Sequence, residues 1–320
     1  MKKIKILQFP IANSYGGITH YALENWKWMN KEQFQVDFAT MSKKLDFADE
    51  ITGSKIHYIS CYAEENREQF IKEVNQILDQ GYDIVHLHTK QWKSFLMEEI
   101  CVERGVPRII VHSHSTRCDA NDEEKRKNET EDHYKVRSEF SEHYATDFWA
   151  CSRKAAEWLF GEQIPKDKIR IMNNAIETEK FLFNERKRSE LRKEFHLDGK
   201  FVIGTVGRMV YQKNHEFLLD VFFGICAEKP EAVLVIAGDG ELRNEIEDQI
   251  DRLGIKDRVL MLGKRTDTNE LYQMMDLFVL PSRFEGLPIT LIEAQASGLK
   301  CICSATITDE ADITGRVEYC

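Results

Sequence analysis

The chain of 320 residues lacks the features that define several protein classes. It has no apolar run near the ~20 residues needed to cross a bilayer, and no CxxC pair among its eight cysteines. Basic side chains are fewer than acidic ones, 44 against 54, so the formal net charge is −10. A nucleic-acid binder normally presents a net basic face, and this composition disfavours one. A local basic pocket for a small anion is still compatible with it.

Several catalytic fingerprints are also missing. Neither a GxxxxGK[ST] P-loop nor a GxSxG nucleophile elbow occurs. The nearest match to a dinucleotide GxGxxG motif, Gly238-Asp-Gly240-Glu-Leu-Arg243, has arginine at the third glycine. We interpret it as a tight turn into a helix, which disfavours an NAD-dependent oxidoreductase. No Asp-x-Asp occurs, so a single-domain transferase that holds a nucleotide sugar through a divalent metal is not expected.

The N-terminus and the cysteines indicate a cytoplasmic protein. After the initial Met-Lys-Lys, the apolar stretch covers only Ile4–Pro10 and is interrupted by Lys5 and Gln8. It is too short and too polar for a signal peptide, and we expect a first strand there. Cysteines scattered through a chain of this length are typical of reduced, mostly buried thiols rather than of a disulfide framework.

Short apolar runs alternate with helical patterns along most of the chain. The expected strands are Ile4–Phe9, Val36–Met41, Ile56–Ile59, Asp83–His88, Arg108–His112, Phe148–Cys151, Ile169–Met172, Phe201–Val206, Ala232–Ala237, Val259–Leu262, Leu277–Leu280 and Cys301–Cys303. This alternation predicts an α/β protein with doubly wound, parallel, Rossmann-like sheets. The length suits two domains, and a polar stretch at 173–200 separates them, so we predict domains 1–172 and 173–320.

Two segments are dense in charge. Glu185–Glu194 is interpreted as the solvated face of a helix. Asp119–Arg137 mixes both signs and is interpreted as a long exposed loop followed by the start of a helix.

The first domain offers two candidate ligand contacts, because ligands bind beyond the carboxyl ends of parallel strands. Gly16–Gly17 precedes an expected helix. Glycines let a ligand approach the backbone closely, and the N-terminus of a helix favours an anion. The alternative interpretation is a turn between strand and helix that binds no ligand. The pairs His86 with His88 and His112 with His114 have two-residue spacing, so each pair shares one strand face. Since no carboxylate or cysteine stands beside them, we interpret one histidine at each strand end as a polar contact at the cleft and expect no metal.

The second domain carries a more specific signal. Gly207 and Arg208 follow the strand Phe201–Val206, and Lys213 lies five residues after Arg208 at the start of a helix. Two cations at the mouth of a parallel sheet are suited to neutralising phosphates. A purely structural arginine and lysine is the alternative.

Two glutamates frame a turn beyond the strand Leu277–Leu280. Glu285 and Glu293 are separated by seven residues, Gly286 allows a turn, and Pro288 suits the first turn of a helix. Glu285 is therefore expected in the loop and Glu293 about one and a half turns into the helix. Carboxylates at such a sheet edge are suited to bind vicinal hydroxyls of a sugar or ribose.

These motifs together resemble family 4 glycosyltransferases, whose GT-B fold has two Rossmann-like domains that face a cleft. The resemblance covers nearly the whole chain. It rests on Gly16–Gly17, Asp83–His88, Val111–His114, Ala150–Ser152, Asn173–Ile176, Gly207–Arg208 with Lys213, Gly238–Arg243, and Glu285 with Glu293. The segments Ala150–Arg153 and Trp158–Gly161 resemble segments of bacterial capsule and exopolysaccharide enzymes.

The resemblance implies a hexosyltransferase-type enzyme that moves a sugar from a nucleotide-sugar donor, by family habit UDP-linked, with retention and without a metal or cofactor. Arg208 and Lys213 would clamp the donor diphosphate, and Glu293 would bind the ribose. Glu285 would contact the transferred sugar. The other implied donor contacts are Gly16, Gly17 and Gly207, the backbone amides of Gly286, Leu287 and Pro288, Arg265 near the base, His112 on the sugar and, as a weaker candidate, His114.

The implied acceptor is a glycan or lipid-linked sugar of surface polysaccharide synthesis, with peripheral contact to the inner face of the plasma membrane and no nucleic-acid partner. Family members normally continue beyond the point where this chain stops, at Arg316–Cys320, so the resemblance also predicts an incomplete second domain. Two alternatives stay open. One is a donor-binding but inactive fragment or subunit, and the other is a GT-B sugar-nucleotide epimerase or phosphorylase.

Overall fold

The computed structural model describes residues 2–13 and 16–320. Its contacts divide the chain into two compact units, of which unit 1 comprises 1–118 and 124–174 and unit 2 comprises 119–123 and 175–320. The short segment 119–123 therefore belongs to unit 2, although its neighbours in sequence belong to unit 1.

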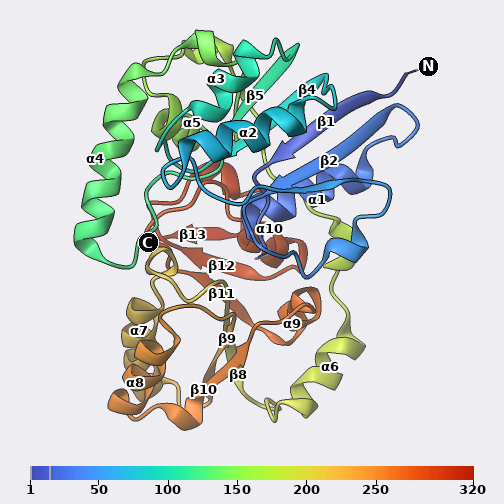
Figure 1. The fold of residues 1–320 in the computed structure, drawn as a ribbon. Helices are drawn as coiled ribbons and strands as arrows, with labels where there is room; N and C mark the ends of the chain where they lie inside the picture. The colour runs from blue at the N-terminus through green and yellow to red at the C-terminus, as the bar shows by residue number, and fades with distance from the viewer. Residues whose placement is uncertain (1, 14–15) are drawn as a thin grey trace. The chain divides into compact units, whose positions relative to one another are not determined.

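Unit 1 is built on a parallel seven-stranded sheet in the order β3-β2-β1-β4-β5-β6-β7 (Figure 1). The strands are β1 (Ile4–Phe9), β2 (Phe34–Thr40), β3 (Ile56–Tyr58), β4 (Ile84–Thr89), β5 (Arg108–Ser113), β6 (Asp147–Ala150) and β7 (Ile169–Ile171), and the helices are α1 (Gly17–Trp28), α2 (Arg67–Leu78), α3 (Leu96–Glu103), α4 (Glu123–Glu139) and α5 (Arg153–Phe160). The chain adds strands from β1 to one edge and from β4 to the other, so its winding reverses between these two neighbours. Ligand crevices of doubly wound sheets open at such a reversal.

The core of unit 1 follows from apolar strands that are covered on both faces. Leu7, Val85 and Val111 lie on the adjacent strands β1, β4 and β5, and all three are completely buried. In the loop after β4, the buried indole of Trp92 donates a hydrogen bond of 2.8 Å to the carbonyl of Leu159, which satisfies its one buried donor.

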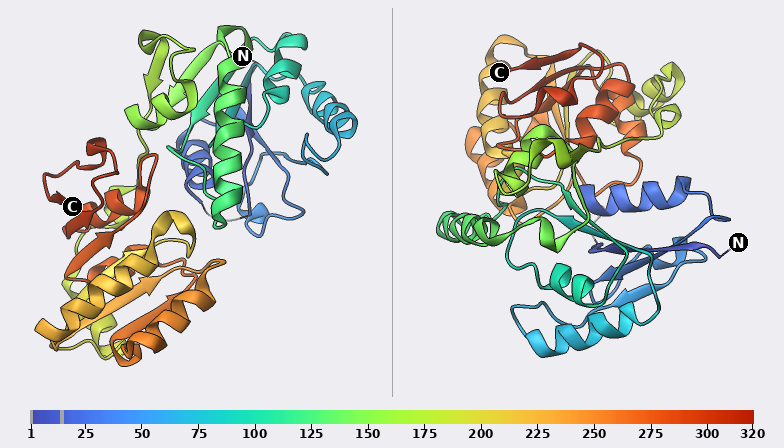
Figure 2. Two further views of the ribbon diagram at one scale, coloured as in Figure 1. Left: turned by 90° about the vertical axis from the view of Figure 1, so that its left-hand side faces the viewer. Right: turned by 90° about the horizontal axis from the view of Figure 1, so that it is seen from above.

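Unit 2 is a parallel six-stranded sheet in the order β10-β9-β8-β11-β12-β13. Its strands are β8 (Phe201–Val206), β9 (Ala232–Ala237), β10 (Val259–Gly263), β11 (Leu277–Leu280), β12 (Lys300–Cys303) and β13 (Val317–Tyr319), and its helices are α6 (Glu185–Glu194), α7 (His215–Glu228), α8 (Arg243–Leu253), α9 (Thr268–Met274) and α10 (Ile289–Ala296). Helices α7 and α8 lie side by side and cover the buried strand β9 (Figures 1 and 2). Here the winding reverses between β8 and β11.

The predicted fold class, two doubly wound parallel sheets, is confirmed, but two local expectations are not. The stretch expected to be mostly loop forms the seventeen-residue helix α4 from Glu123 onward (green in Figure 2). Only His133 is described as buried on α4, so the sequence has no amphipathic pattern there. In α6, Arg188 and Arg192 bind the carboxylate of Asp276 at 2.5 and 3.2 Å, so this helix is anchored by charge and not merely solvated.

Candidate active site

Two cationic side chains, Arg208 and Lys213, follow β8 in the chain. Strand β8 is one of the two strands between which the winding of unit 2 reverses. Arg208 lies just beyond the strand, and Lys213 ends the 3-10 turn Tyr211–Lys213 that leads into α7. Between Lys213 and α7, Asn214 has a φ of 56°, a left-handed conformation that asparagine tolerates. Its side-chain amide donates to the carbonyl of Pro281, beyond β11, at 3.1 Å. This bond connects the loop 207–214, which we call the cationic loop, to the loop that follows β11.

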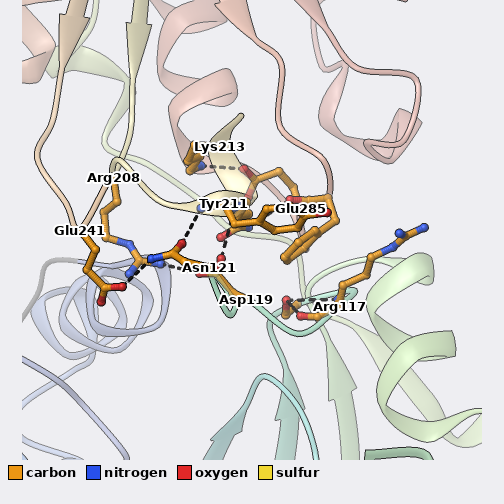
Figure 3. A network of polar contacts seen from close by, with 11 residues as sticks. Arg117, Asp119, Asn121, Arg208, Tyr211, Lys213, Glu241 and Glu285 are labelled. Atoms are coloured by element: carbon orange, nitrogen blue, oxygen red, sulfur yellow. Dashed lines mark hydrogen bonds and ion pairs between the residues drawn. The ribbon is translucent and has the colours of Figure 1, made fainter. Parts of the chain in front are cut away.

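The structure brings Lys213 and Glu285 into direct contact. The Lys213 ammonium donates to Glu285 Oε1 at 2.6 Å, and the two side chains are only 14% and 8% exposed (Figure 3). The Gln212 amide donates to Glu285 Oε2 at 3.0 Å. A buried charge needs such partners, so these three residues hold one another in place.

Arg208 has a partner that the sequence did not reveal. Its Nη2 donates to Asp119 Oδ2 at 3.2 Å, and the backbone N–H of Gln212 donates to Asp119 Oδ1 at 3.3 Å (Figure 3). Asn121 accepts from the backbone N–H of Tyr211 at 2.8 Å. Asp119 and Asn121 belong to the stretch expected as an exposed loop, and no motif marked them.

Glu293 lies on α10 with 7% of its surface exposed. The hydroxyl of Tyr272, from α9, donates to its Oε2 at 2.7 Å. Burial raises the pKa of the Glu293 carboxyl, and the Tyr272 hydrogen bond and the Lys213 charge oppose this without cancelling it. Its Oε1 atom has no hydrogen-bond partner among the described residues, so this oxygen is available to a hydroxyl.

The remaining predicted donor contacts of unit 2 occupy two loops. Arg265, after β10, makes two hydrogen bonds with the carboxylate of Asp267, at 2.8 and 2.5 Å, which fix its guanidinium. Gly286, Leu287 and Pro288 lead into α10, with Pro288 as its N-cap. The expectation of three donating amides is wrong for Pro288, because proline has no backbone N–H.

The backbone of the Gly238-Asp-Gly240 motif packs directly against the backbone of the loop that carries Arg208. A Cβ atom at Gly238 would lie 1.9 Å from the carbonyl oxygen of Gly207, and one at Gly240 would lie 2.4 Å from that of Met209. Gly238 also has a φ of +148°. These glycines therefore let the loop after β9 support the loop that carries Arg208.

In unit 1, Gly16 is the N-cap of α1 and Gly17 is its first residue. Gly17 is exposed, and no atom of the described residues lies within 4 Å of the position that its Cβ would take. Ser14 and Tyr15, which belong to the same predicted loop, lie outside the described residues.

Strands β4 and β5 bring the two histidine pairs together, with His88 directly beside His112 in the register. Gln8 Oε1 accepts a hydrogen bond of 2.7 Å from His88 Nε2. The neutral ring of His88 then has only an acceptor at Nδ1, so His114 Nε2, at 3.0 Å, must donate to it. This leaves Nδ1 of the partly exposed His114 as an acceptor, whereas His112, the first sugar candidate, is completely buried.

Within the described residues, His86, His88 and His112 are the one group whose ligand atoms lie close enough for a metal, within 4.8 Å of one another. The contact between His86 Nε2 and His112 Nδ1 measures 3.2 Å. Burial lowers the pKa of all three imidazoles, to about 3 for His88, so the rings are neutral. The group contains no carboxylate to offset a buried dication, and the expectation of no metal stays a prediction.

The buried His88 should make unit 1 less stable as the pH falls. Its folded pKa of about 3 lies below the unfolded value of 6.5, so below pH 6.5 the unfolded chain binds the extra proton. Stability is lost toward pH 3, by up to ~1.4 kcal/mol per pH unit for this residue. All five tryptophans lie in unit 1, so urea unfolding followed by tryptophan fluorescence at pH 7, 6 and 5 measures it.

Two variants control this measurement. His88→Asn should reduce the pH dependence, whereas His143→Asn, at an exposed position, should leave it unchanged. Equal slopes in wild type and His88→Asn would contradict the assignment.

Two family models cover most of the chain. The model described as Glycosyltransferase Family 4 matches residues 15–180, and that described as Glycosyl transferases group 1 matches residues 187–314. The chain belongs to glycosyltransferase family 4. This glycosyltransferase is an enzyme of the hexosyltransferase type, as its resemblance to the family implied.

Named relatives and solved structures agree with the family. The chain is 31% identical to the putative glycosyltransferase EpsF of Bacillus subtilis (strain 168), over 96% of this chain and 81% of EpsF. It is 28% identical to an Escherichia coli UDP-Gal:alpha-D-GlcNAc-diphosphoundecaprenol alpha-1,3-galactosyltransferase, over 94% and 79% of the two chains. Anabaena Alr3699/HepE, solved with UDP, has a TM-score of 0.72 at 17% identity, over 95% and 81%, and shares the GT-B fold. Among the helices described, none has the length and apolar character to span a membrane.

Proposed function

We propose that this glycosyltransferase transfers a hexose from a UDP-sugar, with retention and without a divalent metal, to a lipid-linked or glycan acceptor of surface polysaccharide synthesis. The reaction would take place in the cytoplasm at the inner face of the plasma membrane. The observation that carries the proposal is the pair of cations, Arg208 and Lys213, at the carboxyl end of β8 where the winding of unit 2 reverses.

The cation pair suits the charge that develops during transfer. Breaking the bond between sugar and phosphate leaves negative charge on the diphosphate and positive character on the sugar ring. Fixed cations stabilise the leaving group, a task that a divalent metal performs in other enzymes. Arg208 and Lys213 are held by carboxylates in loops of the same unit, so they are oriented before a donor arrives.

The two glutamates have separate roles in this proposal. Glu293, with Oε2 fixed by Tyr272 and Oε1 without a partner among the described residues, would accept hydrogen bonds from the ribose hydroxyls. Glu285, in contact with Lys213, would lie beside the transferred sugar and help to balance the positive ring. In unit 1, the acceptor atom Nδ1 of His114 would receive a sugar hydroxyl.

The choice of UDP and of the acceptor class draws on the relatives. The Escherichia coli relative is named for a UDP-galactose donor and an undecaprenol diphosphate acceptor, and the Anabaena structure contains UDP. Both are consistent with a uridine diphosphate leaving group and a lipid-linked sugar acceptor for this chain.

The proposal is tested by ligand-induced stabilisation followed by a transfer assay. Thermal unfolding is measured with UDP, GDP, ADP, TDP and NAD, each with magnesium and with EDTA, because a ligand that binds only the folded state raises the melting temperature. We expect a shift with UDP that EDTA does not remove. UDP-galactose, UDP-glucose and UDP-N-acetylglucosamine are then offered with undecaprenol diphosphate sugars, and the anomer of the product is determined by NMR. A shift with NAD alone, or transfer that EDTA abolishes, would contradict the proposal.

A further inference from the structure

A carboxylate of the chain itself occupies the anion-binding position beside Arg208. Asp119 receives the Arg208 guanidinium on Oδ2 at 3.2 Å and the backbone N–H of Gln212 on Oδ1 at 3.3 Å (Figure 3). A guanidinium combined with a backbone N–H is a donor set that binds phosphate oxygens. Asp119 thus stands where an oxygen of a phosphate group would bind.

The second cation is neutralised in the same way. Lys213 contacts Glu285 at 2.6 Å, so each of the two cations after β8 has a carboxylate partner. The two pairs differ in depth, because Lys213 and Glu285 are 14% and 8% exposed whereas Arg208 and Asp119 are 45% and 17% exposed. The pair formed by Asp119 and Arg208 is screened by water and is therefore the easier one to separate.

Asn121 holds the segment that presents Asp119. It accepts a hydrogen bond from the backbone N–H of Tyr211 at 2.8 Å, and its side-chain amide donates to the carboxylate of Glu241 (Figure 3). These bonds are independent of Arg208, so they can persist while the Asp119 carboxylate turns away. A tethered carboxylate acts at a high local concentration, which makes it an effective competitor.

We propose that Asp119 is an internal competitor of the donor diphosphate for Arg208 and the N–H of Gln212. It therefore sets the affinity of the site for phosphorylated ligands. In the unliganded protein it keeps the exposed cation neutralised, and the diphosphate displaces it on binding. After transfer, its return to Arg208 favours release of the nucleoside diphosphate. This inference rests on the proposed function, because it takes Arg208 as a phosphate ligand.

The test compares Asp119→Asn with Asp122→Asn, which removes the same charge from an exposed position of the same segment. Binding of UDP and of inorganic pyrophosphate is measured by calorimetry at low and high salt; pyrophosphate tests the phosphate contacts without depending on the base. We expect Asp119→Asn to bind both ligands about 2- to 5-fold more tightly than wild type, the range of an ion pair that is partly exposed to solvent. Asp122→Asn should lie much closer to wild type. Asp119→Ser provides a second variant in case the first is poorly folded.

A double-mutant cycle with Arg208→Ala separates this inference from the proposed function. If Asp119 acts through Arg208, the gain from Asp119→Asn disappears in the Arg208→Ala background. Unchanged or weaker ligand binding by Asp119→Asn, with Arg208→Ala still impaired, would overturn the competitor role and leave the phosphate clamp in place. Wild-type affinity in Arg208→Ala, or no binding of either ligand by wild type, would overturn both.

Discussion

Replacing Arg208 or Lys213 by alanine is expected to lower turnover by about 10²–10³, the usual effect of removing a preorganised charge stabiliser. Before the donor binds, each side chain is paired with a carboxylate, Arg208 with Asp119 and Lys213 with Glu285. In the proposed reaction each would supply positive charge where the leaving diphosphate becomes more negative, so turnover should fall even at saturating donor. The measurement is steady-state transfer with a UDP-sugar, at saturating donor and acceptor.

Controls must separate lost chemistry from lost structure. Arg252→Ala and Lys300→Ala remove the same charges at exposed positions of unit 2 and should leave turnover near wild type. Lys213→Ala leaves the carboxylate of Glu285 buried without its cation, which also destabilises the fold. The double variant Lys213→Met with Glu285→Gln removes that imbalance, so turnover that stays about 10²-fold or more below wild type in it is not caused by an unpaired buried carboxylate. Near-wild-type turnover in Arg208→Ala and Lys213→Ala would contradict the clamp.

The fold was predictable because the patterns of apolar residues that indicate its strands and helices each lie within a short segment of the sequence. Continuous apolar strands such as Ala232–Ala237, followed by helical patterns, are typical of doubly wound sheets, and the structure confirms them. The length of helix α4, of which only the start was expected, was missed because the helix has almost no apolar face and so leaves no periodic pattern in the sequence. The ion pairs of Arg188 and Arg192 with Asp276 were also missed, since they join residues more than 80 positions apart.

Of the site residues, the sequence could predict only those that lie just after the carboxyl ends of strands. Arg208, Lys213 and Glu285 stand in such places, and parallel topology gathers the ends of strands at one edge. Asp119 and Tyr272 were not predictable, because a single aspartate in a charged stretch and a tyrosine in a helical pattern carry no spacing signal. Their roles arise from tertiary contacts, with Arg208 in one case and with Glu293 in the other.

The glycine motif after β9 yields the second large expected effect. Gly240→Ala should destabilise unit 2 by about 1–3 kcal/mol, because its Cβ would lie 2.4 Å from the carbonyl oxygen and 2.7 Å from the nitrogen of Met209. These are backbone atoms, so the clash is relieved only by moving the loop that carries Arg208. Binding of UDP should therefore weaken together with stability. Thermal unfolding by circular dichroism and calorimetric titration with UDP measure the two effects.

Gly224→Ala is the matched control for this change. Gly224 lies within α7, where a Cβ atom would meet nothing within 4 Å. Alanine there should stabilise the protein slightly, by about 0.5–1 kcal/mol, because it favours the helix more than glycine does. Opposite signs for the same substitution would show that Gly240 is needed for packing against the loop that carries Arg208, which agrees with the interpretation of this motif as a tight turn. A Gly240→Ala protein that is as stable as wild type and binds UDP normally would refute that role.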